Sequence, residues 1–160
     1  KNEKLIRNTT NKILKIKKFG KFDLKIFENK MDKSEHYVLL KGKIKSSKPI
    51  RVRVISTNIL NNIVNFRQND LQKSLKYLSK FNNFALVIIK NQNLNSEKKE
   101  MFKSNNTLRY YGIGAQIIKD LKIRSMILVS RSKKKIIGLE GYGIKISKQE
   151  IIKWKRKKKF

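Results

Sequence analysis

The first third of the chain alternates hydrophobic and polar positions with a period of two, which is typical of half-buried β-strands. Phe22, Leu24 and Ile26 are separated by lysine and aspartate residues, so their side chains share one face of the predicted strand. A polar turn follows, and Tyr37–Leu40 is apolar enough to be the partner strand. The two segments together predict an antiparallel hairpin.

A further strand is expected over Ile50–Ile55, directly after Pro49, which is the one proline of the chain. A proline is tolerated at the start of a strand, because its missing N–H is not needed there. Within this strand Val52 lies on one face, and Arg51 and Arg53 lie on the other. An arginine on the inward face of a strand is a stronger functional candidate than one in a terminal tail.

The second half of the chain mixes helical periodicity with continuous apolar runs. Leucines recur at steps of three and four over Leu71–Phe81, which predicts an amphipathic helix, and a second helix is expected over Leu108–Leu121. The apolar runs Phe84–Lys90 and Ser125–Ser130 predict buried strands, the first of them central. The glycines of GLEGYG, within Ile136–Ile146, are expected to form turns with positive φ before a last strand. This order predicts an α+β fold, with antiparallel N-terminal strands joined to an α/β C-terminal lobe.

Three segments differ in composition and suggest the domain boundaries. Residues 1–18 are basic with scattered apolar positions, and we expect a linker or a connecting helix there. Residues 19–152 carry all the periodic patterns and form the predicted domain. Residues 153–160 include WKRKKKF, and such a charge run is usually a solvated tail.

The chain is strongly basic, with 41 lysine and arginine residues against 11 acidic ones and a formal net charge of +30. Such a balance favours binding to RNA or another polyanion, because clustered cations neutralise phosphates and release counterions. Genomic drift toward A and T is a competing explanation, since it enriches the 33 Lys, 22 Ile and 16 Asn residues together. Lysine outnumbers arginine, the bidentate phosphate ligand, by 33 to 8, which favours drift. Both explanations stay open.

Composition also excludes several classes of protein. The chain has no cysteine, which excludes disulfides and thiolate-bound zinc or iron–sulfur sites. The single histidine, His36, excludes metal motifs built on two histidines, and beside Glu35 we expect it to form a structural hydrogen bond rather than a proton relay. The longest apolar run, Phe84–Ile89, is far shorter than the roughly 20 residues that span a bilayer. We expect a protein with no membrane contact, in the bacterial cytoplasm or inside an organelle.

The segment Leu108–Ile146 carries two motifs, YGIGAQI and GLEGYG, and with them it resembles the C-terminal part of GTP cyclohydrolase II. It is most similar to the version that is fused behind dihydroxybutanone-phosphate synthase in bifunctional riboflavin-biosynthesis proteins. FGKFDLKIF and EHYVLLKG, within Phe19–Gly42, resemble the opening hairpin of that domain, and PIRVRVIS (Pro49–Ser56) resembles the strand that leads into its zinc site. The resemblance covers nearly the whole of residues 19–152 and implies the α+β fold of that family and a homodimer.

Active members of this family hold zinc on three cysteines, in the pattern S-E-C followed downstream by C-x-C. The zinc activates water for attack on the guanine ring of GTP. Laid on this chain without gaps, the three cysteines fall on Asn58, Asn69 and Leu71. None of these is a thiolate, so the resemblance implies a degenerate active site that has lost its zinc. No other cofactor is expected in this domain, and magnesium is expected only where an upstream synthase domain exists.

The remaining catalytic positions of the family match only in part. The acidic residue that precedes its catalytic arginine falls on Thr107, which cannot act as a carboxylate base, while the arginine itself survives as Arg109. The family's R-Q-E-G-R segment should lie near Lys90–Asn95, which reads KNQNLN. We therefore treat Arg109 as a vestige of the catalytic site.

Three nucleotide-contact positions of the family persist, at Arg53, Ser130 and Lys135. An arginine, a hydroxyl and a lysine that converge on one cleft can grip a triphosphate. Each residue also has a structural explanation. Arg53 would form a salt bridge, Ser130 would cap a turn, and Lys135 would be one of three consecutive surface lysines.

The first hypothesis for function is a catalytically silent domain of a riboflavin-pathway protein, with a dimerisation or regulatory role beside a dihydroxybutanone-phosphate synthase, whether or not it still binds GTP. A polyanion-binding or assembly module, for instance one that docks on RNA, is the second. An active cyclohydrolase with a rebuilt site is a remote third.

Overall fold

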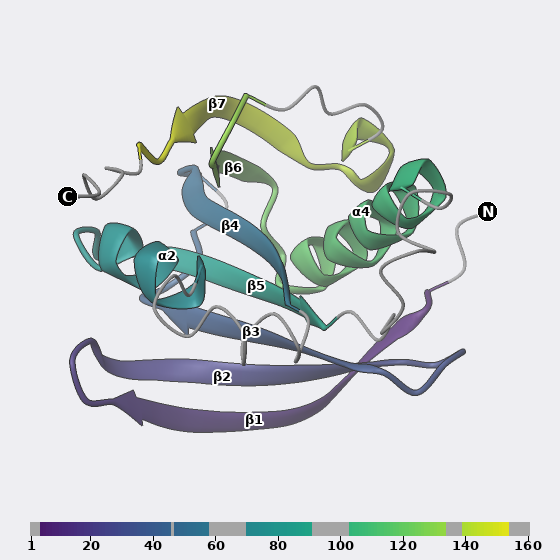
Figure 1. Cartoon of the computed structure of the whole chain (residues 1–160), viewed down its shortest axis with the longest axis horizontal. Helices are drawn as coiled ribbons and strands as arrows, with labels where there is room; N and C mark the ends of the chain where they lie inside the picture. The colour runs from purple at the N-terminus through teal and green to yellow at the C-terminus, as the bar shows by residue number, and fades with distance from the viewer. Residues whose placement is uncertain (1–3, 46, 58–69, 91–102, 134–138, 154–160) are drawn as a thin grey trace, which may run out of the picture.

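The computed structural model describes residues 4–45, 47–57, 70–90, 103–133 and 139–153, and for Thr57 and residues 103–111 it describes the backbone alone. Seven strands form one mixed sheet in the order β1-β2-β3-β5-β4-β6-β7 (Figure 1). The strands are β1 (Ile6–Ile16), β2 (Gly20–Asn29), β3 (Glu35–Lys41), β4 (Ile50–Thr57), β5 (Phe84–Lys90), β6 (Ser125–Ser130) and β7 (Lys145–Ile151). The helices are α2 (Asp70–Leu78) and α4 (Lys103–Asp120), and a short 3-10 helix, η1 (Leu139–Tyr142), precedes β7.

The sheet changes from antiparallel to parallel pairing at its centre. β1, β2, β3 and β5 pair antiparallel, and Leu39 of β3 lies between Leu24 of β2 and Leu86 of β5. β5, β4, β6 and β7 pair parallel. The prediction that Phe84–Lys90 is a central strand is confirmed, since β5 joins the two halves and its first four residues are fully buried.

The α+β class fits a mixed sheet with two helices, but the predicted division into two parts is wrong. The antiparallel strands and the later strands share one continuous sheet, so no separate α/β lobe exists among the described residues. The cause is β5, which pairs with β3 on one side and with β4 on the other.

The N-terminal segment also differs from its prediction. Instead of a linker or connecting helix over residues 1–18, residues Ile6–Ile16 form β1, which pairs with β2 from end to end. Its pattern is weak because β1 is an edge strand, in which Ile6 is the one buried residue. Of the predicted basic tail, residues 154–160 lie outside the described part of the chain.

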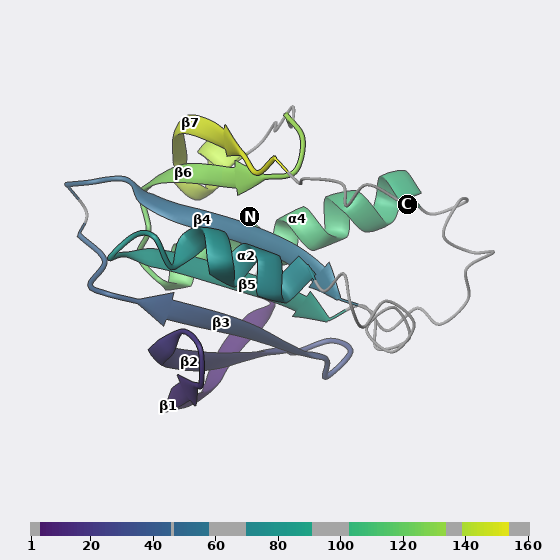
Figure 2. The same cartoon turned by 60° about the vertical axis from the view of Figure 1, so that its left-hand side comes forward.

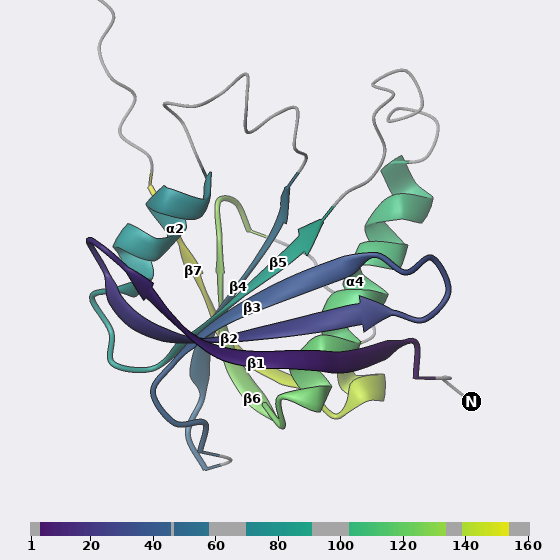
Figure 3. The same ribbon diagram turned by 90° about the horizontal axis from the view of Figure 1, so that it is seen from below.

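Each face of the sheet is covered by one helix (Figures 2 and 3). α4 packs Ile113 and Ile117, which lie one helical turn apart, against strand residues such as Val52. α2 packs Leu75 and Leu78 against the opposite face of the same strands. Neither α2 nor α4 combines the length and the apolar composition that a membrane crossing requires.

The glycine predictions hold only in part. Gly143 has a φ of +73°, a conformation that favours glycine, and it directs the chain from η1 into β7. Gly141 has no positive φ, contrary to expectation, and Gly138 lies outside the described residues. A Cβ at Gly114 would lie 3.5 Å from the Ile89 side chain, an ordinary van der Waals contact, so α4 packs on β5 there without requiring a glycine.

Candidate functional site

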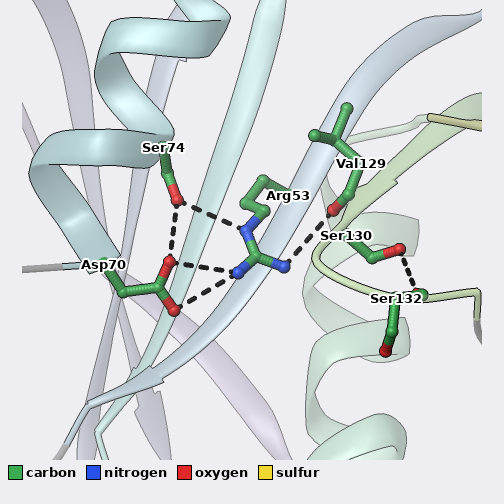
Figure 4. A network of polar contacts seen from close by, with 6 residues as sticks. All are labelled: Arg53, Asp70, Ser74, Val129, Ser130 and Ser132. Atoms are coloured by element: carbon green, nitrogen blue, oxygen red, sulfur yellow. Dashed lines mark hydrogen bonds and ion pairs between the residues drawn. The ribbon is translucent and has the colours of Figure 1, made fainter. Parts of the chain in front are cut away.

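Arg53 lies in the middle of β4 and points toward α2, on the inward face that the alternation predicts (Figure 4). The residue is 6% exposed, which is rare for an arginine and requires that its charge and its N–H groups find partners. Its Nη2 donates to both carboxylate oxygens of Asp70, at 3.1 and 3.2 Å, and its Nε donates to the Ser74 hydroxyl at 3.3 Å.

The two partners come from the first turn and a half of α2. Asp70 begins the helix, where a carboxylate also interacts favourably with the helix dipole, and Ser74 follows one turn later on the same side. The Ser74 hydroxyl in turn donates to Asp70 Oδ1 at 3.3 Å. The three side chains therefore form a closed network, which we call the Arg53 network.

The third contact of Arg53 reaches β6. Its Nη1 donates to the Val129 carbonyl at 3.5 Å, which is a long and weak hydrogen bond (Figure 4). Arg53 thus joins β4, β6 and the start of α2. The salt bridge foreseen as its structural explanation is present in the structure.

Ser130 ends β6 next to Val129, and the structure brings this strand end close to Arg53 (Figure 4). Its side chain does not join the network. The Ser130 hydroxyl donates to the carbonyl oxygen of Ser132 at 2.7 Å and so closes the turn that follows the strand. This geometry matches the turn-capping role that the sequence allows.

The other two candidate residues are not placed by the structure. Lys135 lies outside the described residues. Arg109 belongs to α4, but only the backbone is described there, and the same holds for Thr107. Convergence of Arg53, Ser130 and Lys135 on one cleft therefore stays a prediction.

The structure describes one of the three residues onto which the resemblance places the family's zinc ligands. Asn58 and Asn69 lie outside the described residues, whereas Leu71 lies in the first turn of α2, half-buried against the apolar cluster beneath that helix. Its side chain carries no atom that binds a metal, so the residues present do not fit a three-thiolate zinc site. Among the described residues, no three His, Asp or Glu side chains gather closely enough to hold a metal ion.

Sequence reasoning missed Asp70 and Ser74 as the partners of Arg53. A usable signal exists, because an acidic residue directly precedes the predicted helix and a serine follows four positions later. A buried arginine on the neighbouring strand needs such an acceptor, and these two are the acceptors that the following helix offers.

His36 has partners that differ from the imagined relay with Glu35. The residue is 1% exposed, its Nδ1 accepts a hydrogen bond from the backbone N–H of Lys90 at 3.2 Å, and its Nε2 lies 3.0 Å from the Ser34 hydroxyl. Since Nδ1 is an acceptor, Nε2 carries the ring proton and donates a hydrogen bond to the Ser34 hydroxyl. That hydroxyl in turn donates a hydrogen bond to Asp32 at 2.6 Å.

This direction of hydrogen-bond donation indicates a structural role for Asp32, Ser34 and His36. A serine nucleophile needs a histidine that accepts its proton, whereas here the Ser34 hydroxyl donates its hydrogen bond to Asp32. Burial lowers the pKa of His36, and the charge of Asp32 only partly opposes that effect. Burial alone would raise the pKa of Asp32, but hydrogen bonds from Ser34 and the charge of His36 hold it below its ordinary value.

A second, half-buried polar network lies on the same face as Arg53. Arg51 donates to both oxygens of Glu150, at 2.8 and 3.0 Å, and its guanidinium stacks 3.5 Å from the ring centre of Phe81. Tyr77 donates to the same carboxylate at 3.0 Å. The hydrogen bonds from Arg51 lower the pKa of Glu150, and they outweigh the opposing effect of burial.

Two surface cavities lie away from Arg53 and Ser130, neither of which lines them. One, of about 290 Å³, lies between the start of the chain, α4 and η1, and its walls include Lys4, Gln116 and Tyr142. The other, of about 580 Å³, is an open depression along β7.

The comparisons with known proteins agree on one family. The family model of GTP cyclohydrolase II matches residues 7–151. The riboflavin biosynthesis protein RibBA of Chlorobium phaeovibrioides is 30% identical over 151 residues, which cover 80% of this chain and 37% of that protein. A protein of Photobacterium phosphoreum named 3,4-dihydroxy-2-butanone 4-phosphate synthase is 31% identical over 140 residues, 80% of this chain and 39% of that one.

One solved structure shares the fold. The crystal structure of RibBX, titled a two-domain 3,4-dihydroxy-2-butanone 4-phosphate synthase from A. baumannii, superposes with a TM-score of 0.68 at 18% identity. The match covers 96% of this chain and 42% of that one, so the chain spans about two fifths of the proteins it matches. The match to residues 7–151 also extends the domain into the segment predicted to be a linker. The chain belongs to the GTP cyclohydrolase II family.

Proposed function

We propose that this domain is a catalytically silent member of its family and serves as a dimerisation or regulatory module beside a dihydroxybutanone-phosphate synthase. The proposal is supported by two features that lie together at the start of α2, namely Leu71 and the Arg53 network. A leucine stands at a position where the family places a zinc ligand. The arginine that would meet the nucleotide is engaged with Asp70.

The energetics of the Arg53 network support a silent site. A triphosphate could bind Arg53 only by displacing the Asp70 carboxylate or by lying beside it, and two anions on one buried guanidinium repel each other. The side chain of Arg53 is 7% exposed, so an incoming phosphate also finds little free surface on it. We therefore expect this domain to bind GTP weakly or not at all.

The proposed partner follows from the relatives. Those compared here are longer than this chain, and two of them are named as dihydroxybutanone-phosphate synthases. A domain that has lost its own chemistry is retained where it still stabilises or regulates its neighbour.

The first experiment measures bound zinc and GTP turnover in the purified protein, with an active GTP cyclohydrolase II as the positive control. We expect substoichiometric zinc and no GTP ring opening above background. Stoichiometric zinc together with turnover would overturn the silent site.

The second experiment uses a variant that tests the role of Leu71 directly. The triple substitution Asn58→Cys, Asn69→Cys and Leu71→Cys restores the three thiolates. We expect it to gain zinc without gaining turnover, because Thr107 still replaces the family's carboxylate. Turnover in the triple variant would show that the metal alone was missing.

The third experiment concerns the partner. Formation of dihydroxybutanone phosphate from ribulose 5-phosphate is measured for the synthase with and without this domain, together with the mass of the assembly in solution. We expect removal of the domain to lower the synthase rate or to dissociate its dimer. An unchanged rate and an unchanged mass would contradict the proposed role.

A further inference from the structure

The two ends of the β1–β2 hairpin differ sharply in charge. At the far end of β2, the chain turns to β3 through residues 30–34, where Glu28 pairs with Arg7 and Lys33. At the other end, β1 turns into β2 with Lys17 and Lys18 in the turn. Lysines dominate this second end, which we call the hairpin tip and define by Lys15, Lys17, Lys18 and Lys21.

The fold holds these four lysines close together. Lys15 and Lys21 are directly opposite each other in the antiparallel register, so their Cβ atoms lie roughly 5 Å apart on one face. The turn between them is closed by a hydrogen bond from the Phe19 N–H to the Ile16 carbonyl at 3.0 Å. Ile16 and Phe19 pack against the cluster beneath α2, which anchors the tip to the core.

The charge of the tip is not neutralised within the described part of the chain. All four lysines are exposed, and none of the ion pairs between described residues includes any of them. The one carboxylate of the adjoining strand segments is Asp23, opposite Ile13. Like charges placed directly opposite each other destabilise a hairpin, so the tip lowers the stability of the fold unless an anion binds there.

We propose that the hairpin tip binds the phosphodiester backbone of a nucleic-acid duplex. A duplex presents fixed negative charges at roughly one per 1.7 Å of its axis, a denser row than an extended acidic peptide offers at about 3.3 Å per residue. A two-stranded β-ribbon also fits the roughly 12 Å width of a major groove. β1 and β2 form such a ribbon at the edge of the sheet (Figures 1 and 3).

This inference is independent of the proposed function, because the hairpin tip includes none of the residues of the Arg53 network. It also separates selected charge from codon drift. Drift would place lysines wherever the surface tolerates them, and binding would then depend on net charge alone. A built site makes binding depend on the four positions of the tip.

The experiment compares two quadruple variants of equal net charge in the full chain. The tip variant carries Lys15→Gln, Lys17→Gln, Lys18→Gln and Lys21→Gln. The control variant carries Lys30→Gln, Lys76→Gln, Lys119→Gln and Lys145→Gln, at exposed lysines in a turn, two helices and β7. Binding to a mixed-sequence DNA duplex and to the RNA duplex of the same sequence is measured between about 50 and 200 mM salt.

The slope of log affinity against log salt is negative. We expect its magnitude to decrease by roughly 3 to 4 in the tip variant and by less than about 1 in the control. Equal losses in both variants would overturn the proposal and assign binding to net charge. Displacement of the duplex by polyglutamate at equal charge would overturn it in favour of an acidic protein partner. Comparison of the two affinities shows whether the tip binds the DNA duplex or the RNA duplex more tightly. A thermal melt of each variant verifies folding, and we expect the tip variant to melt no lower than the wild type.

Discussion

The two faces of the sheet bury different chemistry beneath their helices. The buried cluster next to α4 is apolar, with Ile117, Val52 and Val87 at 0% exposure, and the buried polar residue His36 lies further along the same face, where it alternates with Val38 and Leu40. Under α2 the apolar cluster is interrupted by Arg53, itself 6% exposed, and by Ser74, and the half-buried Arg51–Glu150 pair lies on the same face. The polar face also carries Leu71, one of the positions onto which the resemblance places a zinc ligand.

This difference is consistent with the proposed loss of a site on a retained fold. An apolar face is stabilised by packing alone and needs no partner of opposite charge. Buried charges on the other face need partners that balance them. Asp70 is such a partner for Arg53, and it lies next to Leu71, which cannot bind a metal.

The largest effect is expected on the apolar face. Ile117→Ala removes a fully buried side chain from the middle of α4 and should lower the free energy of unfolding by about 2–5 kcal/mol. Denaturant unfolding measures it, with the exposed Lys119→Ala of the same helix as the control, for which we expect a change within about 0.5 kcal/mol. Equal costs for both variants would mean that α4 is not packed as described.

A smaller effect is expected at the Arg53 network, and it should be asymmetric. Asp70→Ala leaves a buried guanidinium without its anion and should cost about 2–3 kcal/mol. Arg53→Met should cost less, because the side chain of Asp70 is 35% exposed and can be hydrated once its partner is gone. The double variant completes a thermodynamic cycle, in which we expect a coupling energy of about 1–2 kcal/mol. No coupling, or a larger cost for Arg53→Met, would argue against a structural network.

The second polar network should be weaker because both charges are more exposed, at 23% for Arg51 and 18% for Glu150. We expect Glu150→Gln to cost about 1–2 kcal/mol, since it keeps the shape of the side chain but removes the charge that Arg51 holds. Neutralisation of exposed Glu140 provides the comparison. A cost above that of Asp70→Ala would reverse the ranking of the two networks.

The smallest effect, a dependence on pH, arises outside both networks. The folded protein holds the pKa of His36 below its ordinary 6.5, so the unfolded chain binds the proton more readily. Stability should therefore decrease as the pH falls below about 6.5 toward the folded pKa. Thermal melts of wild type and His36→Gln between about pH 8 and pH 5 measure this dependence. An equally steep fall in the variant would assign the effect to Asp32 or to other carboxylates.

Much of the fold can be predicted from the sequence, because the inner strands have strong hydrophobic patterns. Phe84–Lys90 and Ser125–Ser130 were recognisable as continuous apolar runs, and Val52 and Arg53 alternate between faces as expected. β1 escaped recognition because an edge strand exposed on both faces has no apolar stripe to detect. The single sheet was also missed, since strand order depends on long-range pairing that no local pattern contains.

The candidate site was predicted less completely. The sequence identified Arg53 and Leu71 through the family resemblance, yet it could not show that Arg53 meets Asp70, because that contact depends on how α2 lies on the sheet. His36 likewise needs the approach of β3 to the end of β5 before its partners are visible. Sequence patterns thus locate the residues of a site, and the packing of elements decides which contacts they make.

The central claim is that Arg53 serves the fold rather than a nucleotide, and a thermal-shift titration with GTP tests it most directly. The protein is melted with GTP and with ATP, at low salt and at about 0.2 M salt, the higher concentration serving to screen binding that depends on net charge alone. The account predicts small shifts, equal for the two nucleotides, that vanish in salt. A specific ligand at a hundredfold its Kd adds about 2.7 kcal/mol, or roughly 5–10 °C for a domain of this size. A GTP-specific shift of that size that persists in salt would contradict the account.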